Sequence, residues 1–190
     1  MPLEETLSAF DELIRGGKVA HAGLSNFDGA QVAEAAGIAA AGGLAPLTNL
    51  QNNYSLLDRA AADDVFAVCA RHGIGFTAFS PLVGGWLTGK YWQPRAYPRG
   101  SRMTLRPDPY RHLERPGTFA ALAKLERAAA DWGMDLATLA LAWVLADPGV
   151  SAVIVGPRRP EQLEPALAAL EVSLSEAERA KLTELVRPEG

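Results

Sequence analysis

Residues 73–91 read GIGFTAFSPLVGGWLTGKY. The stretch opens with apolar, β-branched and aromatic residues, which are typical of a buried strand, and continues into a glycine-rich turn. Gly84, Gly89 and Lys90 match G-x-x-x-x-G-K, the phosphate-binding loop of many nucleotide triphosphatases. The stretch therefore raises two questions: which fold contains this strand, and which kind of phosphate, if any, its turn binds.

Apolar runs and helical periodicities alternate on both sides of this stretch. Strands are predicted over residues 18–27, 46–57, 73–83 and 150–156. Helices are predicted over 3–15, 28–41, 59–73, 118–133, 135–147, 159–170 and 173–186. This alternation predicts a parallel sheet with helices outside it, and the apolar strands predict burial of both sheet faces. Residues 83–117 are rich in Pro, Gly and Arg, and we expect a long loop there.

Composition narrows the possible functions. The 190 residues are 48% hydrophobic and 21% charged, which predicts a single domain over 1–190 with a hydrophobic core. The formal net charge is -4, and no basic run interleaved with aromatic residues indicates a nucleic-acid partner. No apolar run approaches the roughly 20 residues of a membrane span, so we expect no membrane partner and a cytoplasmic location. Cys69 is the single cysteine, which excludes an internal disulfide and a CxxC metal site.

A nucleotide triphosphatase loop requires more than its glycines and its lysine. A Ser or Thr must follow the lysine to hold Mg²⁺, and a helix must begin there. In this chain Tyr91 follows Lys90, and Pro94 comes soon afterwards, where it opposes a helix. The sequence therefore favours a phosphate loop of another kind.

Each predicted strand brings amide, hydroxyl or cationic groups to its carboxyl end. Ligands bind beyond the carboxyl ends of the strands in barrels and open α/β sheets, so these residues are the first candidates for a site. Each of them alone is also an ordinary turn residue. The four strands end in Ser25 and Asn26, in Gln51, Asn52 and Asn53, in Ser80, Pro81 and Leu82, and in Gly156, Pro157, Arg158 and Arg159.

Four segments together resemble the aldo-keto reductase family, in the order in which the family has them. They are GKVAHAGLSNF at 17–27, LQNNYSLLDR at 50–59, residues 73–91, and GVSAVIVGPRRPEQLEPALAAL at 149–170. The segments are similar in style to the bacterial members that resemble potassium-channel β-subunits. The resemblance implies an eight-stranded (β/α) barrel that reduces carbonyls with NADPH and without a metal. It covers only the second half of that barrel, so the predicted fold class is α/β, a partial parallel (β/α)8 TIM-type barrel of about four βα units plus C-terminal helices.

The resemblance assigns the nicotinamide end of a cofactor site. Ser25 and Asn26 match the family's pair that hydrogen-bonds the nicotinamide carboxamide, and Gln51 matches their partner. An amide group needs both a donor and an acceptor, which Asn and Gln supply. Phe79 matches the aromatic residue that stacks on the nicotinamide ring.

The resemblance also assigns the phosphate end of the site. The segment that passes over the pyrophosphate corresponds to Ser80, Pro81, Leu82, Val83 and Gly84. Lys90 matches a cation for the cofactor phosphates, and Arg102 is a weaker candidate for the same role. Gly156, Arg158 and Gln162 match contacts after the last strand, where the Arg158 guanidinium suits an adenosine 2′-phosphate. The implied cofactor is NADP(H), with NAD(H) as the alternative.

The sequence departs from the family in two respects. The family's adenine-binding Glu and Asn are replaced in the run Glu164-Pro165-Ala166, which predicts a weaker hold on adenine. The family's catalytic Tyr, Asp, Lys and His belong to the first half of the barrel, so we assign no catalytic residue here. We therefore expect a truncated carbonyl reductase without turnover of its own, whose open barrel edges promote self-association. The alternatives are a non-catalytic NADP(H)-binding or regulatory subunit, and a degenerate gene product.

Overall fold

A computed structural model describes residues 2–92 and 95–187 of the chain. Pro94, to which the sequence gives a helix-opposing role, lies outside the described residues. The chain divides into two compact units. The first comprises the residues up to Tyr54, Arg59–Phe79 and Gly149–Ala152, and the second comprises Ser55–Asp58, Ser80–Pro148 and the residues from Val153 onward. A single domain over 1–190 stays a prediction.

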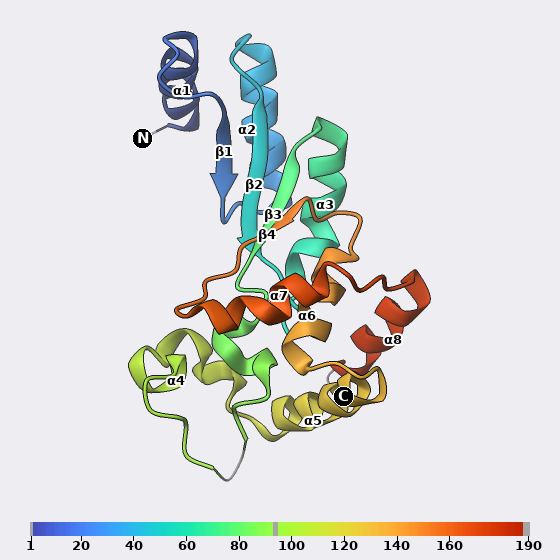
Figure 1. The fold of residues 1–190 in the computed structure, drawn as a ribbon. Coiled ribbons are helices and arrows are strands. Elements are labelled where there is room, and N and C mark those ends of the chain that lie inside the picture. The colour runs from blue at the N-terminus through green and yellow to red at the C-terminus, as the bar shows by residue number, and fades with distance from the viewer. Residues whose placement is uncertain (1, 93–94, 188–190) are drawn as a thin grey trace. The chain divides into compact units, whose positions relative to one another are not determined.

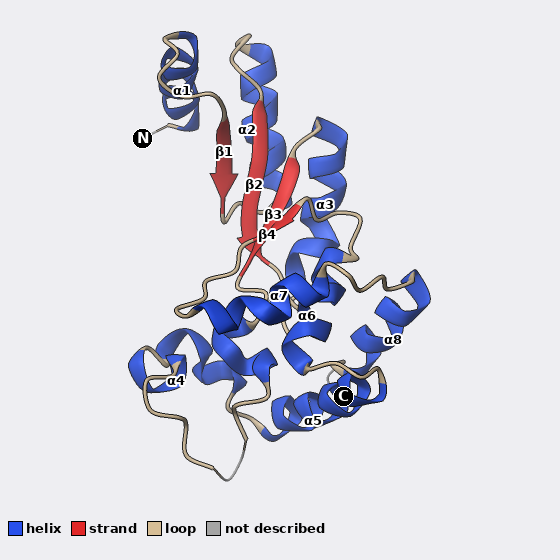
Figure 2. Ribbon diagram, viewed as in Figure 1, coloured by secondary structure: helices blue, strands red, loops and turns tan. Residues whose placement is uncertain are grey.

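The first unit is a parallel βα arrangement (Figures 1 and 2). Its helices are α1 (Leu3–Arg15), α2 (Gly29–Ala41) and α3 (Ala60–His72), and its strands are β1 (Ala22–Ser25), β2 (Leu47–Asn53) and β3 (Gly75–Phe79). The strand order is β1-β2-β3-β4, and β1, β2 and β3 pair in parallel. Strand β4 (Ala152–Val153) begins in this unit, where the Ser151 amide donates to the Phe76 carbonyl at 2.8 Å.

Local sequence signals explain where these helices begin and end. Asp28 caps α2: its side chain accepts from the Gln31 amide, and the Gln31 side chain accepts in return from the Asp28 amide. Helix α3 ends at Gly73, whose φ of 66° is left-handed and favours glycine. These caps fix the short connections that bring successive strands into one sheet.

Only one face of this sheet is buried, so the prediction that both faces are buried is wrong for this unit. Leu50, Phe76 and Ala78 alternate along β2 and β3 and are fully buried. The residues on the other face are half-buried or exposed, and except for Phe79 those of β3 and the residues Ser25 and Gln51 are polar or small. The alternation follows from the period of two along a strand, and it leaves one face free for chemistry.

The second unit is mostly helical (Figure 2). Its elements are η1 (Val83–Thr88), α4 (Arg102–Leu105), η2 (Asp108–Leu113), α5 (Pro116–Asp131), α6 (Leu136–Leu145), η3 (Pro160–Leu163), α7 (Glu164–Ala169) and α8 (Glu176–Leu185). Helix α6 is buried along nearly its whole length. Arg179 of α8 lies over the Trp143 ring and pairs with the buried Asp147. Within the described ranges, no single helix is long and apolar enough to cross a membrane, and only α5 and α6 together, bent by 90°, reach that length and composition.

Three boundaries differ from the sequence prediction. Strand β3 ends at Phe79 instead of continuing to residue 83, because Ser80 has a φ of 54° and leaves the extended conformation. The strand predicted at 150–156 is reduced to Ala152–Val153. The helix predicted at 159–170 divides into η3 and α7, since Pro165 has no N–H to donate to a preceding turn.

The predicted long loop over 83–117 is also wrong in part, because this segment contains η1, α4 and η2. Met103 and Leu113 of this segment are buried, although the segment has no helical period of apolar residues that would predict their burial. Helices of four to six residues are not stable on their own hydrogen bonds alone, so the burial of Met103 and Leu113 is needed to stabilise these short turns.

Candidate functional site

The first unit gathers four of the predicted site residues at the carboxyl ends of its strands. Ser25 ends β1, Gln51 lies opposite it in β2, and Phe79 ends β3. Asn26 follows directly after β1. We call these four residues the polar rim. In the parallel register Ser25 is opposite Gln51, and Phe79 is opposite Asn53, two residues beyond Gln51.

The backbone of the rim fixes the position of Asn26. Its φ of 59° is left-handed, a conformation that Asn tolerates better than most residues. Its amide donates to the Gln51 carbonyl at 3.1 Å, and its Nδ2 donates to Ser25 Oγ at 3.2 Å. Ser25 and Asn26 are exposed and Gln51 is half-buried, so their polar atoms can reach a ligand.

Two further polar residues, which the sequence analysis missed, lie on the same face as Gln51. Thr77 pairs with Gln51 in the register of β2 and β3, and its Oγ1 donates to Asn49 Oδ1 at 2.9 Å. The period of two through Asn49, Gln51 and Asn53 is the signal that could have located this face. Asn52 lies between Gln51 and Asn53 and is also polar, so the alternation is interrupted where the strand ends.

In the second unit, residues 80–90 form a turn that we call the glycine turn. Ser80, Val83, Gly84 and Gly85 have φ values of 54°, 49°, 61° and 100°. The Val83 amide donates to the Ser80 carbonyl at 2.9 Å, and the Gly85 amide donates to the Leu82 carbonyl at 2.9 Å. A left-handed φ is a true outlier for a β-branched residue such as Val83, and such strain concentrates at ligand sites.

Glycine is required at two positions of this turn. A Cβ on Gly84 would lie 2.5 Å from Cζ of the Tyr110 ring, and a Cβ on Gly85 would overlap the end of the Lys90 side chain. Tyr110 therefore packs directly over the backbone of the turn, and the Lys90 side chain folds back across it. The absence of side chains at these two positions lets a cation lie against the main chain.

Three of the predicted cofactor cations act on one another in this unit. The pKa of the exposed Lys90 ammonium is lowered, because the surrounding protein partly withdraws it from water and because Arg158 and Arg102 repel it. None of the three is paired with a carboxylate among residues 2–92 and 95–187. We call Lys90, Arg102 and Arg158 the cation cluster. It is a site of uncompensated positive charge, which an anion would relieve.

Arg158 is held in place from two directions. Its backbone amide donates to Gln162 Oε1 at 2.8 Å, and its Nη2 donates to the Gly100 carbonyl at 2.7 Å. The second bond ties the end of the β4 segment to the segment that carries Arg102. Gly156 is exposed, and a Cβ on it would meet no atom within 4 Å, so packing does not explain glycine there.

An aromatic cluster supports the glycine turn from behind. Trp86 is fully buried, and its ring packs against Tyr91, Tyr97 and Phe119. The Tyr91 hydroxyl donates to the Gly84 carbonyl at 3.1 Å. The sequence analysis did not assign these contacts, since they arise from an irregular segment without a periodic signal.

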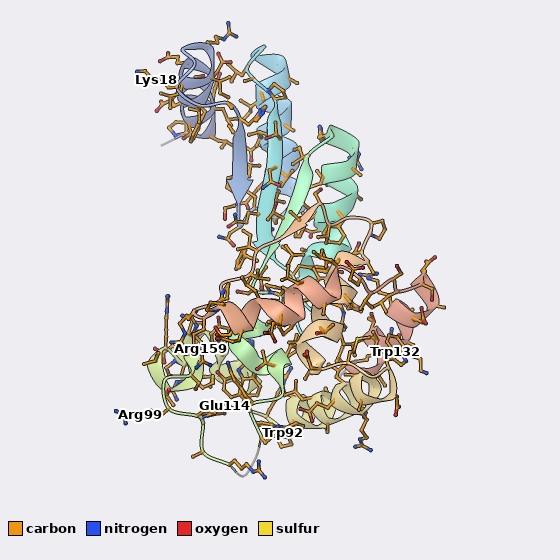
Figure 3. The ribbon with its side chains drawn as sticks, in the orientation of Figure 1. Lys18, Trp92, Arg99, Glu114, Trp132 and Arg159 are labelled. Carbon is orange, nitrogen blue, oxygen red and sulfur yellow. The ribbon has the colours of Figure 1, made fainter. Side chains whose placement is uncertain are left out.

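The sequence singles out none of the four tyrosines as a catalytic acid, and the hydroxyls of two of them, Tyr91 and Tyr97, already donate hydrogen bonds. Tyr54 is fully buried, and the Tyr91 hydroxyl is already bonded within the turn. The Tyr97 hydroxyl donates to Glu114 Oε1 at 2.7 Å, and burial together with this carboxylate raises the pKa of Tyr97 to about 12. Glu114 is labelled in Figure 3. Tyr110 covers Gly84 with its ring.

The two sets of side chains suit different chemical groups. The hydroxyl and amide groups of the polar rim can donate to and accept from a carboxamide. The cation cluster, with Arg158 as a planar guanidinium, suits phosphate oxygens. Over the described ranges, no group of three or more His, Cys, Asp or Glu residues is arranged to hold a metal ion.

Comparisons with known proteins show which family the sequence resembles. The profile of the Aldo/keto reductase family matches residues 1–187. An uncharacterized oxidoreductase, YrpG of Bacillus subtilis (strain 168), is 38% identical over 174 residues, 91% of this chain and 51% of its own length. A probable voltage-gated potassium channel subunit beta of Arabidopsis thaliana is 34% identical over 90% of this chain and 53% of its own length. An NADH-specific methylglyoxal reductase of Escherichia coli (strain K12) is 29% identical over 97% and 54%.

This chain thus spans about half the length of the curated relatives that it matches. The match nevertheless extends over nearly all of its own residues and includes the polar rim, the glycine turn and the cation cluster. Relatives of this family are carbonyl-reducing oxidoreductases and potassium-channel β-subunits, and the family generally binds nicotinamide cofactors. The chain belongs to the aldo/keto reductase family.

Proposed function

We propose that this chain is the cofactor-binding half of an NAD(P)H-dependent aldo-keto reductase. In this proposal it supplies the second half of a (β/α)8 barrel, and carbonyls are reduced to alcohols only when the other half completes the site. The parallel order of β1, β2 and β3, each followed by polar residues, supports the barrel assignment.

The cation cluster carries the proposal. Lys90, Arg102 and Arg158 lie close enough for the two guanidinium groups to lower the pKa of Lys90, and no described carboxylate neutralises them. The three cations repel one another in the free protein. A bound pyrophosphate or phosphate monoester would add attraction to each cation and offset that repulsion. The strained Val83 and the Cβ-free Gly85 in the same turn fit a backbone built for close approach of a ligand.

The family resemblance gives the polar rim of the first unit a separate role, that of holding the nicotinamide. Ser25, Asn26 and Gln51 would hold the carboxamide, and Phe79 would offer its ring face to the nicotinamide. When bound, the cofactor supplies the hydride. The chain's own residues position it and hold its charge, which lowers the entropic barrier of the reaction without contributing an acid.

No proton donor is proposed among the residues of this chain. A reduced carbonyl oxygen requires a positioned acid, and the hydroxyls of Tyr91 and Tyr97 already donate to Gly84 and Glu114. We therefore propose that the 190-residue chain by itself binds the reduced cofactor and does not oxidise it.

Arg158 is the residue that we propose discriminates NADPH from NADH. Its guanidinium is oriented by the Gly100 carbonyl and retains donors for a 2′-phosphate. Pro165 and Ala166 replace the adenine-binding residues of the family, so adenine contributes less to the affinity for the cofactor. The phosphate contacts therefore account for a larger share of that affinity. One relative is named as NADH-specific, so the choice of cofactor requires a direct measurement.

The test is a titration of the chain with NADPH and with NADH, followed by nicotinamide fluorescence. We expect binding of both, with NADPH the tighter ligand, and constant nicotinamide absorbance after an aromatic aldehyde is added. In Arg158→Met the affinity for NADPH should fall about tenfold to a hundredfold, while NADH affinity changes little, because a charge-assisted hydrogen bond is removed. If the chain bound neither cofactor, the proposal would be wrong. Rapid oxidation of NADPH by the chain alone would contradict the claim that it lacks a proton donor.

A second candidate function is a nucleotide-binding or regulatory subunit that never turns over. The same engaged tyrosine hydroxyls favour it, and a relative is named as a potassium channel subunit beta. Addition of the N-terminal half of the Bacillus subtilis relative to the chain distinguishes the two. NADPH oxidation with an aldehyde in the mixture would support the reductase, and binding without oxidation would support the subunit.

A further inference from the structure

Helices α5 and α8 of the second unit border a groove that the proposed function does not use (both helices are labelled in Figure 1). Its volume is about 270 Å³, just below the range of roughly 300–1,000 Å³ that is typical of sites for drug-sized ligands. Neither the polar rim nor the cation cluster contributes to its lining. The groove is therefore a separate cavity with room for one small molecule.

Both walls of the groove are held in place by packing within the second unit. Leu122 and Leu125 of α5 are buried, and so is Leu182 of α8. The Trp143 Nε1 also donates to the Arg179 carbonyl of α8 at 3.1 Å. A groove between two anchored helices is already formed before a ligand arrives, so binding requires little ordering of the protein.

One side of the groove is apolar and is formed by Trp132, Leu182 and Leu185. Trp132 directly follows α5 and is half-buried (labelled in Figure 3). Among the described residues, neither an aromatic ring nor a cation stacks on the indole of Trp132. This indole is therefore open to a ligand, and a large aromatic side chain suits a flat apolar group.

The charged side chains of the groove are mostly cationic. Lys124 and Arg127 of α5 and Lys181 of α8 supply three cations, and Asp131 supplies one carboxylate. Arg127 and Asp131 have the spacing of a helical ion pair, but the Arg127 Nε donates to the Ala123 carbonyl at 3.3 Å. In the part of the chain that the structure describes, Arg127, Asp131 and Lys181 form no ion pair. The excess of cations favours an anion, although the whole chain has a net charge of -4.

We propose that this groove binds a small aromatic carboxylate. The ring of the ligand lies against Trp132 and the two leucines, and its carboxylate accepts hydrogen bonds from Arg127 and the two lysines. An inorganic anion would gain nothing from the apolar side. A carboxylate suits the groove better than a phosphate dianion, because Asp131 repels a second negative charge. The inference concerns a site apart from the proposed cofactor site and does not require that NADPH binds.

The first experiment titrates the chain with 2-naphthoate in an isothermal calorimeter, with 2-naphthamide and 2-naphthyl phosphate as comparators. We expect 2-naphthoate to bind with a dissociation constant of about 0.1–1 mM, as its number of non-hydrogen atoms allows. The neutral amide should bind about tenfold less tightly, because it lacks charge-assisted hydrogen bonds. Absence of binding up to about 10 mM would overturn the inference. Tighter binding of the phosphate ester would overturn the choice of a carboxylate.

Substitutions on α5 test the charged side of the groove. Arg127→Gln should weaken 2-naphthoate binding about tenfold and leave 2-naphthamide binding unchanged, whereas Arg127→Lys should lose less than about threefold. Asp131→Asn should tighten 2-naphthoate binding about twofold to threefold, since a repulsion is removed. Because both side chains are exposed, these variants should retain the circular dichroism of the unsubstituted chain.

Lys18→Gln is the matched control for Arg127→Gln. It removes one positive charge at an exposed position of the first unit (Lys18 is labelled in Figure 3), so it should leave 2-naphthoate affinity unchanged. An equal loss in Lys18→Gln and Arg127→Gln would mean that the ligand responds to the net charge of the chain. That result would overturn a site in the groove.

The indole N–H signal of Trp132 locates the ligand in the NMR spectrum of the isotope-labelled chain. It is the signal that disappears in Trp132→Phe, and it should shift when 2-naphthoate is added. A fixed Trp132 signal, with another indole signal shifting, would place the ligand elsewhere and overturn the inference. Loss of 2-naphthoate binding in Arg158→Met or at saturating NADPH would do the same, because the ligand would then occupy the cofactor site.

The two proposals fail separately. A chain that binds 2-naphthoate in the groove but binds neither NADPH nor NADH leaves this inference standing and removes the proposed function. A chain that binds NADPH but not 2-naphthoate does the reverse. Arg127→Gln should leave NADPH affinity unchanged, since Arg127 belongs to neither the polar rim nor the cation cluster.

Discussion

The polar rim and the glycine turn present their functional groups in opposite ways. In the rim, regular strand register aligns Ser25 with Gln51, and ordinary extended backbone positions the side chains. In the glycine turn, left-handed residues and missing side chains bring the Lys90 ammonium against the main chain. The geometry of the rim comes from regular strand pairing, and that of the glycine turn comes from a few residues with left-handed φ. Substitutions near the rim should therefore leave its backbone in place, whereas one substitution at a left-handed residue of the glycine turn should disrupt the turn.

The largest effect should follow from Gly85→Val. A β-branched residue at a φ of 100° is strained, and its Cβ would occupy the position of the Lys90 side chain end. We expect about 3 kcal/mol of lost stability from the backbone strain and loss of NADPH binding through displacement of Lys90. Denaturant unfolding and nicotinamide fluorescence measure the two effects.

The matched control is Gly117→Val in the same unit. Gly117 lies in the first turn of α5, has no left-handed φ, and would bring its Cβ near no other atom. The free energy of unfolding of the Gly117→Val variant should differ from that of the unsubstituted chain by less than about 0.5 kcal/mol. If Gly85→Val proved as mild as this control, the glycine turn would not depend on its exceptional backbone, and the contrast between the two regions would disappear.

Removal of a rim side chain should act on binding and leave the fold intact. In Gln51→Leu we expect about a tenfold loss in affinity for NADPH, because one net hydrogen bond is lost and the strand register remains. Affinity for adenosine 2′,5′-bisphosphate, which lacks the nicotinamide, should be unchanged. Equal losses for both ligands would mean that Gln51 does not contact the carboxamide.

The same contrast explains how much the sequence revealed. The βα order and the place of Ser25 and Phe79 at strand ends could be predicted, since strand ends, caps such as Asp28 and the period of apolar residues are local signals. The open sheet face was not predicted, because the polar Asn52 interrupts the alternation of Asn49, Gln51 and Asn53. The order within residues 83–117 was missed because it depends on Met103 and Leu113, whose burial comes from contacts distant in sequence.

Asn26 is the residue of the rim that has a left-handed φ. Its substitution therefore tests separately what the backbone conformation and the side chain of this residue contribute. Asn26→Ala should lower stability by about 1 kcal/mol, because alanine pays the full cost of a left-handed φ of 59°. Asn26→Gly should leave stability nearly unchanged. Both variants lose the Nδ2 bond to Ser25, so both should bind NADPH less tightly by a similar factor. Equal stabilities of the two variants would show that backbone conformation is unimportant here.

The smallest effect concerns the pH dependence of the cation cluster in the glycine turn. The pKa of Lys90 in the folded chain lies below lysine's ordinary 10.5. Between these two pKa values the unfolded chain binds more protons than the folded one, so the stability of the free chain should rise with pH in that window. Solvent screening of the exposed ammonium keeps this rise small. Thermal unfolding of the chain without cofactor measures it.

Cofactor affinity should change in the opposite direction over the same window. An anion that binds the cluster favours the protonated Lys90, so NADPH should bind less tightly as pH rises and that proton is lost. In Lys90→Arg both trends should vanish, because a guanidinium remains charged throughout. A stability that falls with rising pH in the free chain, or an affinity independent of pH, would mean that Lys90 does not share its charge environment with Arg102, Arg158 and the ligand. The rim contains no titrating group, so Gln51→Leu should retain both pH trends and locate them in the glycine turn.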